Sequence, residues 1–226
     1  MSGGRRLVAM RGAALIGLVA SVALGMAAKG AASPLEAASF VTGAACVWLT
    51  VKENPWNFPI GLVNVATFLV VFARAGLLAD AGLQAVYFVL GCRGWYLWVR
   101  GGEDHAGLRV AGAGVAERLG VALAVVAMTA ALWPVLARSG GSAPFWDALT
   151  TSISLGAQWL LNRKRPESWL AWILVDAIYV PLYASKSLHL TAVLYAIFLG
   201  MAVMGLLEWR GREATAKGQP EGEVAG

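Results

Sequence analysis

The chain has 226 residues, of which 58% are hydrophobic and 14% are charged, and its mean hydropathy is +0.65. A soluble domain of this length carries about 25% charged residues, so the composition excludes an ordinary soluble domain and is typical of an integral membrane protein. The formal net charge of +5 does not by itself indicate nucleic-acid binding, and we expect no nucleic acid among the partners. Cys46 and Cys92 lie in apolar runs, which favours buried thiols over a disulfide framework.

Eight apolar segments are candidates to cross a bilayer, which requires about 20 residues. The third, sixth and seventh are short and contain polar residues, as helices that line a cavity do. Proline, glycine and charge interrupt the pattern between segments, in stretches such as KENPW, RSGGSAP and NRKRPE. In chain order the predicted helices are Arg6–Ala28, Pro34–Val51, Asn57–Ala75, Leu78–Val99, Glu117–Arg138, Pro144–Asn162, Glu167–Ala184 and Leu188–Trp209.

The two ends of the chain differ from the rest. Residues 1–33 predict an extra N-terminal hydrophobic helix, although two arginines, an apolar run and MAAKGAAS also fit a cleaved secretory signal peptide. Residues 211–226 are polar and predict a disordered tail. The core is therefore expected over residues 34–210.

The distribution of the 18 Lys and Arg residues predicts the orientation. If the N-terminus is cytoplasmic, the opposite side of the membrane receives only Lys29, Arg74, Arg138 and Lys186. Arg93 falls within a helix, where snorkelling toward the interface is the simplest interpretation, and all other basic residues fall on the cytoplasmic side. Because positive charge marks cytoplasmic loops, both termini are predicted to be cytoplasmic.

The sequence also aligns with a shifted copy of itself. Under one fixed shift, Trp48 falls on Trp159, Phe58 on Trp169, and Trp98 on Trp209. We infer two three-helix repeats, over residues 34–100 and 144–210, joined by a linker helix over residues 117–138. A single intervening span leaves the two repeats parallel, an arrangement that transporters commonly use, with the substrate site between the repeats near the midplane. The predicted fold is thus an all-α integral membrane protein with a 3+1+3 core. We call the shift that places Trp48 on Trp159 the repeat offset.

Polar side chains inside the predicted helices are the candidate functional residues, because burying a polar group in lipid without a hydrogen-bond partner costs roughly several kcal/mol. A carboxylate in mid-helix is a functional candidate by default, and Asp176 is one. Trp169, Trp172 and Asp176 recur at spacings of three and four and so share one helix face, which Tyr179 and Tyr183 continue. An acid beside aromatic rings suits a flat ring, either cationic or neutral, that bears hydroxyl groups.

Other intramembrane polar residues admit two interpretations. Asn64 lies near the middle of the third segment, and we expect it to point into the cavity between the repeats, where an amide can donate to and accept from a sugar hydroxyl. Gln84 is equally compatible with a hydrogen bond that only joins two helices.

These residues carry a family resemblance. WNFPIGLVN, DAGLQAVYFVLGCRGWYLW and QWLLNRKRPESWLAWILVDAIYVPLY together resemble the PnuC-type vitamin transporters over roughly residues 40–210. Phe58 stands where many relatives have tryptophan. The resemblance implies a seven-helix core similar in architecture to the SWEET proteins but mirrored in topology, a homotrimer in the cell inner membrane, and facilitated diffusion of nicotinamide riboside. Phosphorylation by a separate cytoplasmic kinase would then retain the vitamin for NAD biosynthesis.

The resemblance also implies the substrate-binding residues. Carried over by position, they are Asn64, Gln84, Tyr87, Gln158, Trp169, Trp172, Asp176 and Tyr183. Sister groups carry thiamine or riboflavin, and these substrates remain alternatives, as does a proton-coupled carrier that uses Asp176 as a relay.

No motif predicts an enzyme. The two histidines, His105 and His189, lie in or beside predicted loops and far apart. The sequence contains no metal-ligand pattern, phosphate-binding loop or nucleophile motif. We therefore expect no catalysis, cofactor or metal, and no ATP-driven pump, although a membrane scaffold or an intramembrane enzyme remains a remote alternative.

Overall fold

The computed structural model describes residues 14, 17–30, 34–74, 78–102, 105–139 and 143–218, and within these residues all regular structure is helical. The helix bounds agree closely with those predicted from the apolar pattern. Besides a short apolar helix over Gly17–Ala28, the helices are α2 (Pro34–Val51), α3 (Asn57–Arg74), α4 (Leu78–Arg100), α5 (Val115–Arg138), α6 (Pro144–Asn162), α7 (Glu167–Ser185) and α8 (His189–Gly218).

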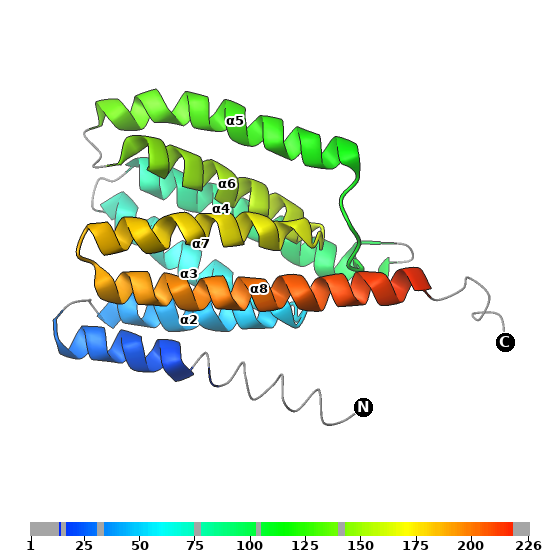
Figure 1. Cartoon of the computed structure of the whole chain (residues 1–226), viewed down its shortest axis with the longest axis horizontal. Coiled ribbons are helices and arrows are strands. Elements are labelled where there is room, and N and C mark those ends of the chain that lie inside the picture. The colour runs from blue at the N-terminus through cyan, green and yellow to red at the C-terminus, as the bar shows by residue number, and fades with distance from the viewer. Residues whose placement is uncertain are drawn as a thin grey trace.

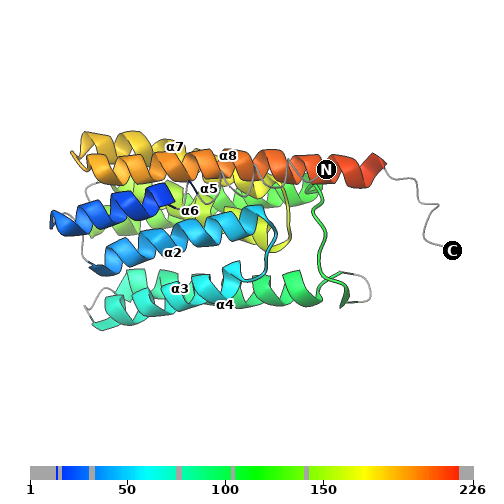
Figure 2. The same cartoon turned by 90° about the horizontal axis from the view of Figure 1, so that it is seen from below.

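The helices lie side by side in a bundle (Figures 1 and 2). Helices α2, α3 and α4 contact one another in sequence, as do α6, α7 and α8, whereas α5 packs on α6. Two further contacts, α2 with α8 and α4 with α6, join these two groups. We call the end at which α2, α4, α6 and α8 finish the Glu53 end, after the residue in the turn between α2 and α3.

Helices α2 and α6 end in the same kind of turn. Glu53 and Lys164 follow them with φ of 54° and 52°, the left-handed region. In each turn the next N–H bonds back to the helix, Asn54 N to Leu49 O at 2.8 Å and Arg165 N to Leu160 O at 3.0 Å. This bond identifies the Schellman motif, which satisfies carbonyls that a helix end leaves unpaired. Glu53 and Lys164 are related by the repeat offset, so the same local solution recurs in both groups of helices.

A cluster of large side chains packs between the two groups of helices near the Glu53 end. Trp98 donates its indole N–H to Leu161 O at 3.1 Å, and Trp209 donates to Val51 O at 3.2 Å. Trp98 of the first group therefore bonds to the last turn of α6, and Trp209 of the second group bonds to the last turn of α2. Buried members of the cluster are Val51, Phe58, Trp98, Val110, Leu161, Trp169, Ala202 and Trp209.

The two chain ends refine the sequence-based expectations. The short helix Gly17–Ala28 contributes Val19 and Met26 to a second cluster with Leu194 and Met201 of α8. Residues 6–13, 15 and 16 of the predicted first helix lie outside the described part of the chain. The polar tail expected from residue 211 is instead helical to Gly218, because Arg212 and Glu213 form tertiary contacts. Residues 219–226 lie outside the described residues.

Four described helical spans are long and apolar enough to cross a membrane by length and composition. They are Asn57–Arg74, Val115–Arg138, Glu167–Ser185 and Thr191–Ala216. The remaining helices are less apolar or shorter within the described residues. Two of the three segments expected to be short and polar, α3 and α7, are thus among the apolar spans, although both line the cavity described below.

Candidate functional site

A cavity of about 300 Å³ lies between the two groups of helices. Both groups contribute to its wall, and the lining residues include none from α5. The first group supplies Cys46, Val47, Thr50, Asn57, Phe58, Gly61, Leu62, Val65, Tyr87 and Gly91, and the second supplies Gln158, Leu161, Trp169, Trp172, Asp176, Tyr195, Phe198 and Ala202.

Most lining positions occur in pairs that are related by the repeat offset. In three of these pairs the first group presents a small or aliphatic residue where the second presents a polar or aromatic one, and these are Val47 and Gln158, Gly61 and Trp172, and Val65 and Asp176. The cavity is therefore two-fold in layout, but its carboxylate comes from the second group alone. The pairs are Val47 and Gln158, Thr50 and Leu161, Phe58 and Trp169, Gly61 and Trp172, Val65 and Asp176, Tyr87 and Phe198, and Gly91 and Ala202.

Aromatic rings form much of the wall. Trp169 is almost wholly buried and packs edge-on against Trp209, with ring centroids 5.5 Å apart. Tyr195 and Phe198 of α8 meet at 6.0 Å. Rings held in this way keep their orientation, so a flat ligand ring finds a preformed stacking surface.

Asp176 supplies the only carboxylate among the lining residues. Its side chain is 6% exposed, and within the described residues it takes part in no salt bridge. A buried carboxylate without a counter-ion is unfavourable, so the cavity suits a ligand that brings positive charge or several hydrogen-bond donors.

Gln158 is held by a chain of amides. Its Nε2 donates to Asn162 Oδ1 at 2.9 Å, and Asn162 Nδ2 donates to Leu90 O at 2.8 Å. These bonds connect α6 with α4, and the Gln158 side-chain nitrogen already donates a hydrogen bond within the protein. Its side-chain oxygen is then the atom available to accept a hydrogen bond from a ligand.

Sequence reasoning missed two polar residues of the wall, Asn57 and Thr50. Asn57 Nδ2 donates to Thr50 Oγ1 at 2.8 Å, and both side chains are buried. The available signal was positional: Asn57 begins a short helix that the sequence already predicted to line a cavity, and Thr50 lies near the end of the preceding helix.

The structure brings together Tyr87, Gln158, Trp169, Trp172 and Asp176, five of the predicted binding residues. It places Asn64 elsewhere, against the expectation that this amide points into the cavity. Phe58, Gly61, Leu62 and Val65 recur at helical spacing and form the cavity face of α3. Asn64 lies on another face, in a shallow hollow with Trp56 and Val63, and donates to Thr42 Oγ1 at 2.9 Å.

Gln84 and Tyr183 are also absent from the lining residues. The repeat offset places Gln84 on Tyr195, which does line the cavity. Tyr183 stacks on Tyr195, with ring centroids 5.2 Å apart and planes inclined by 15°. It therefore supports a wall residue from behind.

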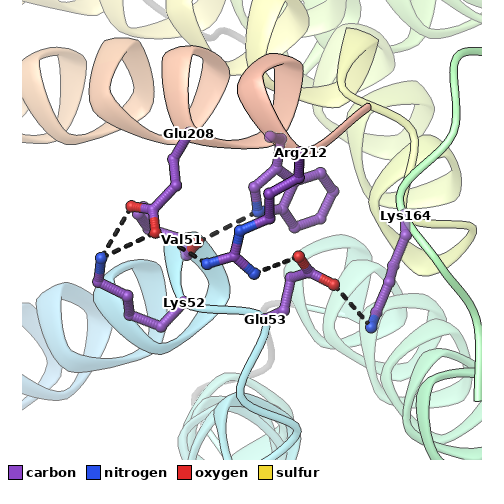
Figure 3. A network of polar contacts seen from close by, with 7 residues as sticks. Val51, Lys52, Glu53, Lys164, Glu208 and Arg212 are labelled. Carbon is purple, nitrogen blue, oxygen red and sulfur yellow. Dashed lines mark hydrogen bonds and ion pairs between the residues drawn. The ribbon is translucent and has the colours of Figure 1, made fainter. Parts of the chain in front are cut away.

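Ion pairs join the two groups of helices at the Glu53 end (Figure 3). Glu53 pairs with Lys164 at 3.0 Å and with Arg212, while Glu208 pairs with Lys52 at 2.8 Å and with Arg212 at 2.8 Å. We call these five residues the Glu53 network. The Lys164 side chain is 9% exposed, and its ammonium lies 4.7 Å from the Trp98 ring centroid. These ion pairs and the contact with Trp98 hold the two groups of helices together at this end of the bundle.

The fold and the cavity define a multi-pass helical membrane protein with a ligand-sized cavity between two groups of helices. Residues 33–211 match the model of a known family, described as nicotinamide mononucleotide transporter. Since this match covers most of the chain, the protein belongs to the nicotinamide mononucleotide transporter family.

Curated relatives share about a quarter of their residues with the chain. The nicotinamide riboside transporter PnuC of Escherichia coli strain K12 is 27% identical over 201 residues, which cover 77% of this chain and 84% of the relative. The riboflavin/roseoflavin transporter RibM of Streptomyces davaonensis is 27% identical over 174 residues, covering 75% and 81%.

A solved structure has the same fold. The crystal structure of the vitamin B3 transporter PnuC superposes with a TM-score of 0.70 at 22% sequence identity, covering 90% of this chain and 92% of that one. The all-helical fold predicted from the sequence is confirmed by this likeness.

Proposed function

We propose that the protein is a membrane transporter that imports nicotinamide riboside by facilitated diffusion. The observation that carries the proposal is the cavity itself: one aromatic-walled chamber with a single carboxylate, enclosed between two groups of helices. Substrate would bind at Trp169, Trp172, Asp176, Gln158 and Tyr87. The protein would release the substrate chemically unchanged, and phosphorylation by a separate kinase would retain the vitamin inside the cell.

The charge of the substrate supports this choice. Nicotinamide riboside carries a positive pyridinium ring, which can stack on an indole while its charge is balanced by a nearby carboxylate. Asp176 has no basic partner in the described part of the chain, so it is free to take that role. Thiamine also carries a cationic ring and remains the second candidate on this criterion.

The size of the chamber separates nicotinamide riboside from riboflavin. Ligand pockets in proteins span about 300–1,000 Å³, and this cavity of about 300 Å³ lies at the lower end. One pyridine ring with one pentose suits such a volume better than the three fused rings and ribityl chain of riboflavin.

We also propose that α2–α4 and α6–α8 are parallel repeats joined by α5. Two observations support this assignment: the cavity positions occur in pairs related by the repeat offset, and the cross-contacts α2 with α8 and α4 with α6 exchange under that offset. Both termini, and hence the Glu53 end, would lie on the cytoplasmic side of a bacterial inner membrane. The resemblance to PnuC-type proteins implies a homotrimer.

Uptake into proteoliposomes tests the proposed function. Purified protein should equilibrate labelled nicotinamide riboside across the bilayer and then stop, with or without a proton or sodium gradient. Excess unlabelled nicotinamide riboside should compete, and riboflavin should compete less. Accumulation above the external concentration that depends on a gradient would instead support the proton-coupled carrier, and absence of uptake for all three vitamins would refute transport of this class.

A further inference from the structure

Arg93 lies well inside the predicted span Leu78–Val99, and the structure gives it no ion pair among the described residues. It lies seven residues before Arg100 at the end of α4, which is roughly 10 Å along the helix at 1.5 Å per residue. Its side chain is exposed on the outside of the bundle. An exposed guanidinium at this depth needs a counter-charge that the chain itself does not provide.

A second guanidinium lies near the same tryptophan ring. The Arg93 guanidinium carbon lies 4.2 Å from the ring centroid of Trp159 on α6, and that of Arg163 lies 5.7 Å from the same centroid. Two like charges repel unless an anion lies near both of them. Arg163 pairs with Glu117 at 3.2 Å, but Glu117 is shared with Arg165 at 3.1 Å, so the group retains an excess of positive charge.

The surface beside the two arginines is apolar. Val86 and Val89 precede Arg93 on α4 at helical spacing, Tyr96 follows it, and all three side chains are largely exposed. An amphipathic ligand could therefore place an anionic group at Arg93 and Arg163 while a hydrocarbon chain lies along Val89 and Val86. Tyr96 lies toward the helix end, where aromatic residues meet lipid headgroups.

We propose that the surface where α4 and α6 meet binds the phosphate of an anionic phospholipid through Arg93 and Arg163. The exposed apolar residues Val86 and Val89 favour a lipid over free phosphate. The depth of Arg93 matches a headgroup that lies slightly deeper in the bilayer than usual, on the side of the Glu53 end. Basic pockets between membrane helices on the cytoplasmic side are a recurrent way of holding such headgroups.

The test uses full-length protein in a zwitterionic detergent. Short-chain phosphatidylglycerol, short-chain phosphatidylcholine and inorganic phosphate are titrated separately at constant ionic strength, and the apparent melting temperature gives each apparent affinity. We expect phosphatidylglycerol to stabilise the protein at the lowest concentration. Arg93→Gln should weaken its apparent affinity by roughly fivefold, since one basic residue near the membrane surface contributes about that much.

Arg210→Gln is the matched control, because Arg210 is another exposed helical arginine but lies on α8. It should leave the affinity for phosphatidylglycerol unchanged. Arg163→Gln provides a second variant at a helix end, should Arg93→Gln fail to fold, and it should also weaken the affinity. Equal effects of phosphatidylglycerol and phosphatidylcholine, or equal affinities of the Arg93 and Arg210 variants, would overturn the proposal. Dissociation of an oligomer by Arg93→Gln with unchanged lipid response would overturn it too, by making this face a contact between copies.

Discussion

Asp176 allows the charge of the ligand to be tested separately from its shape. Asp176→Asn keeps the size of the side chain and one acceptor oxygen, replaces the other oxygen by an NH2 donor, and removes the charge. We expect the variant to bind nicotinamide riboside roughly tenfold more weakly or worse, since a charge-assisted hydrogen bond contributes about 1.5–3 kcal/mol. Dihydronicotinamide riboside, whose ring is uncharged, should bind both proteins about equally. Calorimetric titration of purified protein measures both ligands.

Asn64→Ala is the matched control for this experiment, because Asn64 is an intramembrane amide that bonds to Thr42 rather than lining the cavity. It should leave both affinities unchanged. A comparable loss for both ligands in Asp176→Asn would mean that the carboxylate serves packing or a hydroxyl contact rather than a positive ring.

The site was partly predictable from the sequence for a specific reason. Trp169, Trp172 and Asp176 share a helix face by spacing alone, and the structure turns that face toward the cavity. Asn64 could not be placed in this way, because polarity says that a side chain needs a partner but not whether the partner is a ligand or another helix. Thr42 on α2 meets that need, and contacts between helices are not visible in a single periodicity.

At the scale of the helices, two glycines set how closely α4 and α8 approach their neighbours. A Cβ on Gly94 would lie 2.5 Å from the Phe58 ring, and one on Gly205 would lie 2.5 Å from the Trp169 ring. The repeat offset relates Phe58 to Trp169, and it also relates the two glycines. The same close contact between a glycine and a ring therefore occurs in both groups of helices.

We expect Gly94→Ala and Gly205→Ala each to destabilise the protein by about 1–3 kcal/mol, because overpacking displaces rings that cannot turn away. Gly120→Ala and Gly200→Ala are controls, since a Cβ at either position meets nothing within 4 Å. They should be neutral or stabilising, by up to about 1 kcal/mol from the lower backbone entropy of alanine. Thermal unfolding in detergent measures all four. Equal melting temperatures would show that the bundle relaxes around the added methyl groups.

The helices themselves were predictable because two features determine where a chain can cross a bilayer. These are the length of each apolar segment and the proline, glycine and charged residues that separate the segments. The bounds of α2 and α6 were predicted to the residue, since proline begins each helix and a charged turn follows it. The end of α8 was not. Its polar last turns resemble a tail in composition, but Arg212 joins the Glu53 network and Glu213 accepts a hydrogen bond from Gly112 N at 3.1 Å. Tertiary contacts there override a weak local pattern.

For the molecule as a whole, the Glu53 network should hold one end of the cavity closed. Glu53→Gln removes two ion pairs at once and leaves Lys164, which is 9% exposed, without an acidic partner. Lys164→Gln leaves Glu53 paired with Arg212 and should have a smaller effect. A shift of about 1–2 kcal/mol in an opening equilibrium changes the open population by roughly 5–30-fold, and we expect Glu53→Gln to fall in that range.

Cys46 lines the cavity and provides a native reporter of opening. In a Cys92→Ser background, its alkylation by a polar reagent from the Glu53 end of proteoliposomes should accelerate in Glu53→Gln. Arg118→Gln is the control, because its ion pair with Glu167 involves a side chain that is 57% exposed and exposed pairs contribute little. Unchanged alkylation in Glu53→Gln would mean that the tryptophan cluster alone closes this end.

The ion pair between Glu53 and Lys164 has a consequence for how the two halves arose. These residues are related by the repeat offset and lie in matching turns. Under the proposed repeats they occupy equivalent positions, one in each repeat, and they meet at the approximate two-fold axis that would relate the two repeats. In a symmetric assembly of identical halves, a residue at such an axis meets its own copy, so glutamate would face glutamate and lysine would face lysine. Attraction at this point requires two halves with different sequences. Divergence of the two halves would therefore have been a precondition for this ion pair, because no pair of identical halves could have formed it.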